Sequence, residues 1–388
     1  MSRPKQTNRL RLEYLEARTL FAAVDFIGKG GSCPADISNV AERSVSVSAE
    51  PTVSPLPYSY SLIGNKGNAA ISPTPGLAMM GGGTNVDAAF AWLAGRANKG
   101  DFVVLSASKN DYGRYINGLA TLDSVESLVV PDRAAADHSS LATIIENAEA
   151  IFITGGDQSN YIKYWANTVL ETAIYTAMAR GAALGGSSAG LAVMGQVDYA
   201  ALTTSTTSGE ALANWTTPSI TLDTAFLTPI DRPGTLLDVV HDTVTDSHFM
   251  QRDRMGRTMA FMANADAKDM VSGLPRGIAI NEQTALLVDA SGIATVVGNR
   301  YGKTGTRNAQ QRSVYMFSAP SPVNLVNGSS LSYEVQAQRL NYNPLSTGTS
   351  NTFNLNTWSG SGVDVYTVIA NNGVLSSTSA SVYGPIIA

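Results

Sequence analysis

Short apolar runs alternate with longer amphipathic stretches between residues 77 and 186. The runs have the length and composition of buried strands, and the stretches between them have the period of helices. Strands are expected at 77–80, 102–107, 125–130, 150–154 and 182–186, and helices at 86–97, 139–148 and 158–180. This order predicts an α/β fold, a three-layer sandwich in which helices cover both faces of a mostly parallel sheet. Ligands of such sheets bind beyond the carboxyl ends of the strands.

The chain ahead of this region has a different character. Residues 24–70 combine Gly, Pro, Ser and Val without a helical period, so we interpret residues 1–70 as a leader and an irregular linker, with regular structure from about Leu77. Residues 9–23 follow a basic start but alternate Leu with charge, and they lack the continuous apolar core of a secretory signal. They resemble the LExLExRxLxxA motif that opens many exported proteins of planctomycete-like bacteria. The matching residues are Leu12, Glu13, Leu15, Glu16, Arg18 and Leu20. The motif implies a secreted or cell-surface protein, and a cytoplasmic location stays open.

After about residue 205 the alternation of strand and helix loosens. Apolar runs at 277–280, 284–289 and 293–298 predict antiparallel strands. From Ser318 onward the chain is rich in Ser, Thr, Asn and Gly, with Val, Leu and Tyr in alternation. We therefore expect a main domain at 71–317 and a β-rich appendage or tail at 318–388.

Composition excludes several classes of partner. The net charge of −5 provides no basic field to attract nucleic acid, and no apolar run reaches the roughly 18 residues that a membrane span needs. Because Cys33 is the only cysteine, an intrachain disulfide and a cysteine-rich zinc site are both ruled out. Charged residues make up only 15% of the chain, so its surface must be rich in small polar residues, as in many secreted proteins.

Residues 186–190 read Gly-Ser-Ser-Ala-Gly, a GxSxG pattern between a predicted strand and a helix-forming run. A tight strand-to-helix turn lifts the hydroxyl of its serine clear of the backbone, and flanking glycines remove Cβ atoms that would clash. Amides at the start of the next helix favour a developing oxyanion. The pattern predicts Ser188 as a nucleophile. An ordinary Gly/Ser turn is the alternative, because a chain this rich in both residues contains the pattern by chance.

A serine nucleophile needs a general base, and the chain has only three histidines. His138 lies in a loop before a predicted helix, where capping or solvent exposure explains it. His248 lies in the charged segment DSHFMQRDRMGR, residues 246–257, directly after an apolar stretch. Packing does not explain that density of charge, so we favour His248 as the base. His241, or a solvated polar turn without a base, is the alternative.

A carboxylate should fix the imidazole tautomer and stabilise its cationic form. Glu282, in a turn between two apolar runs, is our candidate, and Asp246 and Asp242 are alternatives. An exposed turn residue explains Glu282 equally well. The chain order serine, histidine, glutamate differs from the serine, aspartate, histidine order of α/β-hydrolases, which argues against a lipase or esterase of that fold.

Two further groups could contact a substrate. In TGGDQSN, residues 154–160, Asp157 is placed to cap a helix, and the preceding double glycine has amides that could form an oxyanion hole. We assign this role to the amides of Gly156 and Ala189. Three guanidinium groups suited to carboxylates follow His248, with a surface salt-bridge cluster as the alternative. They belong to Arg252, Arg254 and Arg257.

Four segments in order resemble the cyanophycinases and their peptidase E relatives. They are TGGDQ at 154–158, GGSSAG at 185–190, DSHFxxRxRxGR at 246–257 and GIAINExTAL at 277–286, within a similarity that covers about residues 75–300. The resemblance implies a serine peptidase on a class I glutamine-amidotransferase-like fold, with Ser188, His248 and Glu282 as its catalytic triad. It also implies a substrate pocket lined by a glutamine, an aspartate and three arginines. These are Gln158, Asp246, Arg252, Arg254 and Arg257.

The resemblance implies cyanophycin as substrate, a poly-aspartate whose side-chain carboxyls carry arginine, and β-aspartyl-arginine as product. No metal or organic cofactor is required, and family analogy makes a homodimer plausible. Two positions depart from the family: Asn281 replaces a frequent Asp, and Ser247 replaces the frequent Gln of cyanophycinases. Because Ser247 adjoins the pocket, an aspartyl or isoaspartyl dipeptidase without polymer activity is an alternative. A catalytically idle secreted protein that binds peptides through the same cleft is another.

Overall fold

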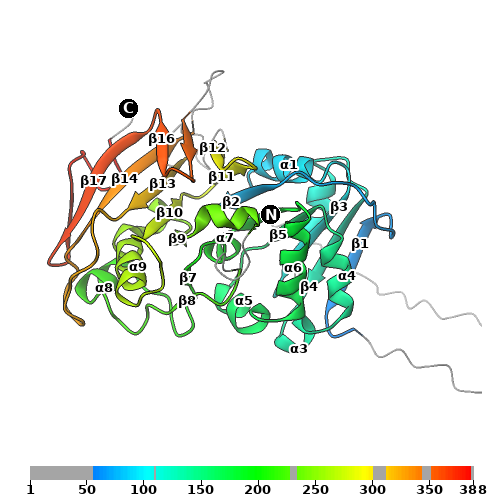
Figure 1. Ribbon diagram of the computed structural model, residues 1–388, viewed down its shortest axis with the longest axis horizontal. Helices are drawn as coiled ribbons and strands as arrows, with labels where there is room; N and C mark the ends of the chain where they lie inside the picture. The colour runs from blue at the N-terminus through cyan, green and yellow to red at the C-terminus, as the bar shows by residue number, and fades with distance from the viewer. Residues whose placement is uncertain (1–55, 109–110, 228–233, 300–311, 343–350, 386–388) are drawn as a thin grey trace, which may run out of the picture. The chain divides into compact units, whose positions relative to one another are not determined.

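The computed structural model describes residues 56–108, 111–227, 234–299, 312–342 and 351–385 (Figure 1). These residues belong to a compact unit that runs from Pro55 to Ala388. The predicted leader motif at residues 12–20 lies outside the described residues, and so does Cys33. Every helix within the described ranges is too short or too polar to cross a lipid bilayer.

A ten-stranded sheet forms the larger part of the fold, in the order β1-β4-β3-β5-β6-β2-β11-β12-β15-β16. The strands are β1 (Ser59–Gly64), β2 (Gly76–Met80), β3 (Asp101–Ser106), β4 (Ser124–Val129), β5 (Ala150–Ile153), β6 (Ala183–Ser187), β11 (Thr284–Asp289), β12 (Ile293–Gly298), β15 (Thr352–Asn354) and β16 (Ser359–Ser361). The five strands from β4 to β2 are parallel to one another. Antiparallel strands extend this parallel centre on both sides. The predicted sheet is therefore confirmed, with its five predicted strands at its centre.

Helices cover both faces of the parallel centre, as the three-layer prediction requires (Figure 1). Side chains of β3 alternate between the two faces, because successive residues of a strand point to opposite sides. Phe102 and Val104 join one apolar cluster with Phe90 of α1, whereas Val103 joins another with Ile174 of α6. The helices are α1 (Asp87–Arg96) and α2 (Tyr112–Asn117) on the first side, and α3 (Arg133–Ala136), α4 (Ser140–Glu146), α5 (Gln158–Trp165) and α6 (Val169–Ala179) on the second.

A second sheet of six strands has the order β18-β17-β14-β13-β10-β9. The strands are β9 (Thr243–Asp246), β10 (Arg276–Ile280), β13 (Ser313–Ser318), β14 (Tyr333–Asn341), β17 (Asp364–Asn371) and β18 (Val374–Ser377). One face packs on α9 (Met255–Ala267), where Tyr315 and Phe317 share a cluster with Phe261. Val314 and Met316 point to the other face and share the core of the ten-stranded sheet.

Short elements connect the two sheets. They are α7 (Ala189–Ala192), α8 (Ser208–Ala213), the strand pair β7 (Asp198–Tyr199) and β8 (Leu222–Asp223), and the 3₁₀ helices η1 (Leu236–Val240) and η2 (Met250–Arg252). All of them lie between β6 and β10 in the sequence, and most follow residue 205, after which the alternation of strand and helix was expected to loosen.

Three sequence-based boundaries differ from the structure. Regular structure begins with β1 rather than near Leu77. The sequence did not predict this strand, because it is an edge strand that is largely exposed and has no apolar pattern. The helical stretch predicted at 158–180 is two helices, separated at Asn167, whose φ of 56° is incompatible with a continuous helix. Among the three predicted antiparallel runs, β11 and β12 form a hairpin, whereas β10 belongs to the second sheet.

The strands that follow residue 318 are integral to both sheets. β14 pairs with β13 over six residue pairs, and β15 pairs with β12 of the ten-stranded sheet. The expected boundary between 71–317 and 318–388 therefore does not coincide with a break in the fold. The β-rich region completes the packing of the main domain.

Candidate active site

Ser188 occupies a sharp turn between β6 and α7. Its φ of 56° and ψ of −108° lie far from the favoured regions for a residue with a side chain, at a cost of about 1–3 kcal/mol. The glycines on either side are required by close packing. A Cβ on Gly190 would lie 2.2 Å from the carbonyl oxygen of Ile153, and one on Gly186 would lie 2.3 Å from that of Gly190. This is the geometry of a nucleophile elbow.

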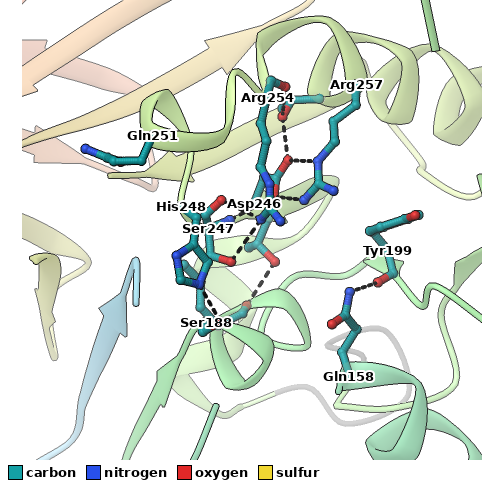
Figure 2. A network of polar contacts seen from close by, with 12 residues as sticks. Gln158, Ser188, Tyr199, Asp246, Ser247, His248, Gln251, Arg254 and Arg257 are labelled. Atoms are coloured by element: carbon teal, nitrogen blue, oxygen red, sulfur yellow. Dashed lines mark hydrogen bonds and ion pairs between the residues drawn. The ribbon is translucent and has the colours of Figure 1, made fainter. Parts of the chain in front are cut away.

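The structure brings Ser188, His248 and Glu282 together in one hydrogen-bonded row. Ser188 Oγ lies 2.7 Å from His248 Nε2 (Figure 2), and His248 Nδ1 lies 2.6 Å from Glu282 Oε1. With its proton on Nδ1, the imidazole donates to the carboxylate and accepts the serine proton at Nε2. This arrangement activates a serine hydroxyl for nucleophilic attack.

The end of β2 holds the three loops that carry these side chains. The carbonyl oxygen of Met80 accepts a hydrogen bond from the amide of Ser188 at 3.0 Å, and that of Gly81 accepts one from His248 at 2.8 Å. The carbonyl of Gly82 accepts one from Gln283, next to Glu282, at 2.8 Å. The turn at 81–83 was expected at this edge of the sheet, but its contact with all three loops was not.

Gly82 is also a point of close approach to the base. A Cβ at this position would lie 2.5 Å from Cε1 of the His248 ring, and the residue has a φ of +89°. Only glycine therefore fits between β2 and the imidazole without displacing it.

Burial and neighbouring cations lower the pKa of His248 below its usual 6.5. Burial is the largest cause, the charges of Arg252 and Arg254 act in the same direction, and the hydrogen bond that the imidazole donates to Glu282 opposes them. The imidazole is consequently neutral near pH 7, the form that can accept a proton from Ser188.

The alternative bases and acids lie in other surroundings. Nδ1 of His241 lies 2.7 Å from the carbonyl oxygen of Asp238, and that of His138 lies 2.8 Å from the hydroxyl of Ser140. The carboxylate of Asp242 accepts the amide of Ser272 at 2.7 Å. None of these three contributes to the row at Ser188.

Asp246 is a buried anchor for two of the predicted arginines. Its carboxylate accepts hydrogen bonds from Arg257 Nε at 2.8 Å and Arg257 Nη2 at 2.5 Å, and from Arg254 Nη1 at 3.2 Å (Figure 2). These charges hold the pKa of Asp246 below its ordinary value even though its burial acts to raise it. The third nitrogen of Arg257 donates to the carbonyl of Thr206, so this guanidinium is committed to the protein. Arg257 therefore orders the wall of the site, whereas Arg252 and Arg254 retain donors for a ligand.

A cavity of about 320 Å³ opens at Ser188. All of the predicted pocket residues line it, together with a wall of hydroxyl side chains that the sequence did not indicate. The lining consists of Gly156, Asp157, Gln158, Ser188, Ala189, Ala192, Tyr199, Ala201, Thr203, Thr204, Ser205, Thr245, Asp246, Ser247, His248, Arg252, Arg254 and Arg257. Its exposed charges are cationic at Arg252 and anionic at Asp157, so the cavity suits a ligand that carries both signs of charge.

Gln158 and Tyr199 join two segments of the chain that line this cavity. Gln158 Nε2 donates to the carbonyl of Tyr199 at 3.2 Å, and the Tyr199 ring stacks on Phe261 with centroids 4.3 Å apart. The hydroxyl of Tyr199 accepts the amide of Thr206 at 2.7 Å. The hydroxyl-rich loop at 203–206 is thereby fixed beside Arg257, which donates to the carbonyl of Thr206.

Gly156 and Ala189 line the cavity next to the nucleophile. Gly156 has a φ of +149°, and the turn before it is fixed by the Tyr161 hydroxyl, which donates to the carbonyl of Thr154 at 2.8 Å. Ala189 begins a helix of only four residues, which is too short to provide a substantial helix dipole, so its amide could stabilise an oxyanion only as an individual donor. Within the described residues, no cluster of three His, Cys, Asp or Glu side chains is placed to hold a metal ion.

Residues 121–296 match the sequence profile of peptidase family S51. The chain is 26% identical over 189 residues to cyanophycinase of Trichormus variabilis, a match that covers 48% of this chain and 55% of the relative. A match to cyanophycinase of Geminocystis herdmanii has 26% identity over 188 residues, with 48% and 60% covered. The chain thus spans little more than half the length of these curated relatives.

Two solved structures are similar over 59% of this chain. One is a peptidase from an acI-B1 Actinobacterium, with 18% identity, 89% of its own chain covered and a TM-score of 0.41. The other is a putative peptidase E protein from Listeria monocytogenes, with 14% identity, complete (100%) coverage and a TM-score of 0.36. On the sequence matches, the chain is similar over residues 121–296 to the cyanophycinase and peptidase E-like peptidases of family S51.

Proposed function

We propose that this protein is a serine peptidase in which Ser188 is the nucleophile, His248 the general base and Glu282 the residue that orients the base. The observation that carries the proposal is the continuous row of two short hydrogen bonds from Ser188 Oγ to the Glu282 carboxylate. An exposed turn residue or a peptide-binding cleft has no need of this arrangement together with a strained serine.

In the proposed reaction, Ser188 Oγ attacks the scissile carbonyl carbon while its proton moves to His248 Nε2. The amides of Gly156 and Ala189 stabilise the resulting oxyanion. The C–N bond then breaks as His248 protonates the leaving nitrogen, and an ester to Ser188 remains. Water, deprotonated by His248, attacks this ester and releases the acid product. No metal or organic cofactor takes part in these steps.

We propose cyanophycin as the substrate, on the basis of the curated relatives and the charges of the cavity. Its carboxylates would contact Arg252 and Arg254, whose guanidinium groups retain free donors. Asp246 is paired with arginines, whereas Asp157, the other carboxylate that lines the cavity, is exposed. We expect a cationic arginine side chain of the polymer to bind at Asp157. Ser247 leaves the small isoaspartyl dipeptides as the second candidate, because a small side chain replaces a frequent family glutamine there.

Purified protein and its Ser188→Ala variant should be incubated with insoluble cyanophycin and with isoaspartyl dipeptides, and the products followed by mass spectrometry. We expect β-aspartyl-arginine from the wild type and a loss of about 10⁴-fold or more in the variant. A serine-reactive fluorophosphonate should label Ser188 in the wild type. Hydrolysis of dipeptides alone would favour the second candidate, and absence of both labelling and hydrolysis would contradict an enzymatic role.

We also infer export to the cell exterior from the motif at residues 12–20, which lies outside the described residues. Cell fractionation of the native host tests it. Recovery of the protein only with the cytoplasm would contradict the inference.

A further inference from the structure

The last described residues contact the loop at 248–254, which carries His248, Arg252 and Arg254. We call residues 381–385 the strap. It is a tight turn in which the amides of Tyr383 and Gly384 donate to Ser381, at 3.0 Å to its hydroxyl and 2.9 Å to its carbonyl. This segment lies outside the part of the chain that matches the peptidase family, residues 121–296.

Arg339 fixes the strap to the six-stranded sheet. This arginine is fully buried on β14, and it donates to the carbonyl of Tyr383 at 2.7 Å and to that of Pro385 at 3.1 Å. Its charge is balanced by Asp364 of β17, at 2.8 Å. A buried guanidinium that satisfies two main-chain carbonyls and a carboxylate gives the strap one defined position.

Tyr383 extends from the strap to the loop at 248–254. Its hydroxyl donates to the carboxylate of Asp253 at 2.6 Å, and its ring packs edge-on against Phe249 with centroids 5.5 Å apart. Burial, and then the neighbouring Asp253, raise the pKa of the phenol far above its ordinary value, so it remains a donor throughout the working pH range. Asp253 has a φ of 48°, an uncommon conformation that this hydrogen bond helps to hold.

Asp253 stands between the two arginines that retain donors for a ligand. We propose that Tyr383 is a positioning residue for the proposed peptidase: by holding Asp253, it fixes Arg252 and Arg254 at the cavity. The base itself has separate support, because the amide of His248 donates to the carbonyl of Gly81, directly after β2. The strap should consequently affect substrate binding more than the chemical step.

The expected change in kinetics rests on the proposed function, whereas the expected change in the stability of the loop rests on the fold alone. Tyr383→Phe keeps the ring on Phe249 and removes only the hydroxyl. The matched control is Tyr333→Phe, since Tyr333 is also buried and its hydroxyl has no partner among the described residues.

Hydrogen–deuterium exchange of the full chain tests the structural part without any substrate. The amides of Arg252 and Arg254 are hydrogen-bonded inside the loop, to His248 and Phe249, and report its opening. We expect about tenfold or faster exchange of these amides in Tyr383→Phe, the wild-type rate in Tyr333→Phe, and no further increase when Asp253→Asn is added. Wild-type exchange in Tyr383→Phe, or additive effects of the two substitutions, would overturn the proposal.

Kinetics with the substrate that the wild type hydrolyses test the functional part. We expect KM to rise by about fivefold or more in Tyr383→Phe, with kcat within about threefold of wild type. A fall in kcat at unchanged KM would overturn the positioning role. A wild type that hydrolyses neither cyanophycin nor isoaspartyl dipeptides would contradict the proposed function, and the exchange rates would then decide the role of the strap alone.

Discussion

The two sheets supply the candidate site in different ways. The ten-stranded sheet contributes Ser188 and Gly156 from turns that directly follow buried parallel strands, so the strands themselves set their positions. The six-stranded sheet contributes His248 and Glu282, each two residues beyond the end of β9 or β10. The carbonyls of Gly81 and Gly82 and the hydrogen bond between the two side chains hold these turns. Ser188 is therefore positioned by the regular fold, whereas His248, Arg252 and Arg254 depend on contacts made by the turn that follows β9.

The largest loss of activity is expected from a change at Glu282, whose carboxylate contacts His248. Glu282→Gln keeps the size of the side chain but removes the charge that supports the imidazolium of His248, and it offers an amide that can favour the wrong tautomer. We expect kcat to fall by about 10³–10⁴-fold with little change in the melting temperature. The control is Glu334→Gln, on an exposed position of β14. A loss below tenfold would mean that Glu282 does not orient the base.

Gly82→Ala tests whether β2 holds the base and the nucleophile in register. The added Cβ would lie 2.5 Å from the imidazole and must displace it. We expect a loss of about 100-fold or more in kcat, since a displacement of 1 Å is costly in catalysis. Gly95→Ala is the control, because a Cβ at that helical position meets no atom within 4 Å. Full activity in Gly82→Ala would show that the base tolerates movement.

Asp157→Asn tests whether the carboxylate that follows β5 of the ten-stranded sheet selects a cationic substrate. Asn retains the cap on α5, where the carboxylate now accepts the amide of Ser159 at 2.9 Å, but it removes the negative charge. We expect the ratio of kcat/KM for a β-aspartyl-arginine substrate to that for a neutral isoaspartyl dipeptide to fall by about tenfold. Asp132→Asn, at the cap of α3 outside the cavity, is the matched control. An equal effect on both substrates would indicate a structural role only.

The smallest effect is expected in the pH profile. The pKa of His248 is lowered, so kcat/KM should be constant near neutrality and should decline only as the pH falls through a value below 6.5. Because Arg252 disfavours the imidazolium, Arg252→Gln should move this acid limb to higher pH, whatever it does to the rate. Arg133→Gln, a half-exposed arginine that pairs with Asp137, should leave the limb in place. A shift to lower pH in Arg252→Gln would contradict the sign.

The parallel centre of the fold could be predicted because its strands are continuous apolar runs separated by helical periods. Each predicted strand from Leu77 to Gly186 corresponds to an observed strand within one or two residues. β1 could not be found in this way, because it is an exposed edge strand whose stability comes from pairing with β4. The placement of β10 and β11 in different sheets also escaped prediction, since a three-residue turn between apolar runs looks like a hairpin.

Within the site, the residue types were predictable and the pairings were not. His248 stood out because the chain has few histidines, and Asp246 because it begins a charged segment. No local pattern showed that Asp246 would form an ion pair with Arg257, which is eleven residues further along the chain. Tyr383 gave no signal at all, because a single tyrosine in a serine-rich segment has no period to recognise.

The hydrogen bonds at the end of β2 have a consequence for the order in which the candidate site forms during folding. Met80, Gly81 and Gly82 precede every other part of the site in the chain, yet their carbonyls are satisfied only when residues 188, 248 and 283 have arrived. Contacts between segments so distant in sequence form late in folding, because each closes a long loop. Helices should thus be regained first on dilution from denaturant, and labelling of Ser188 by a fluorophosphonate only in the final phase.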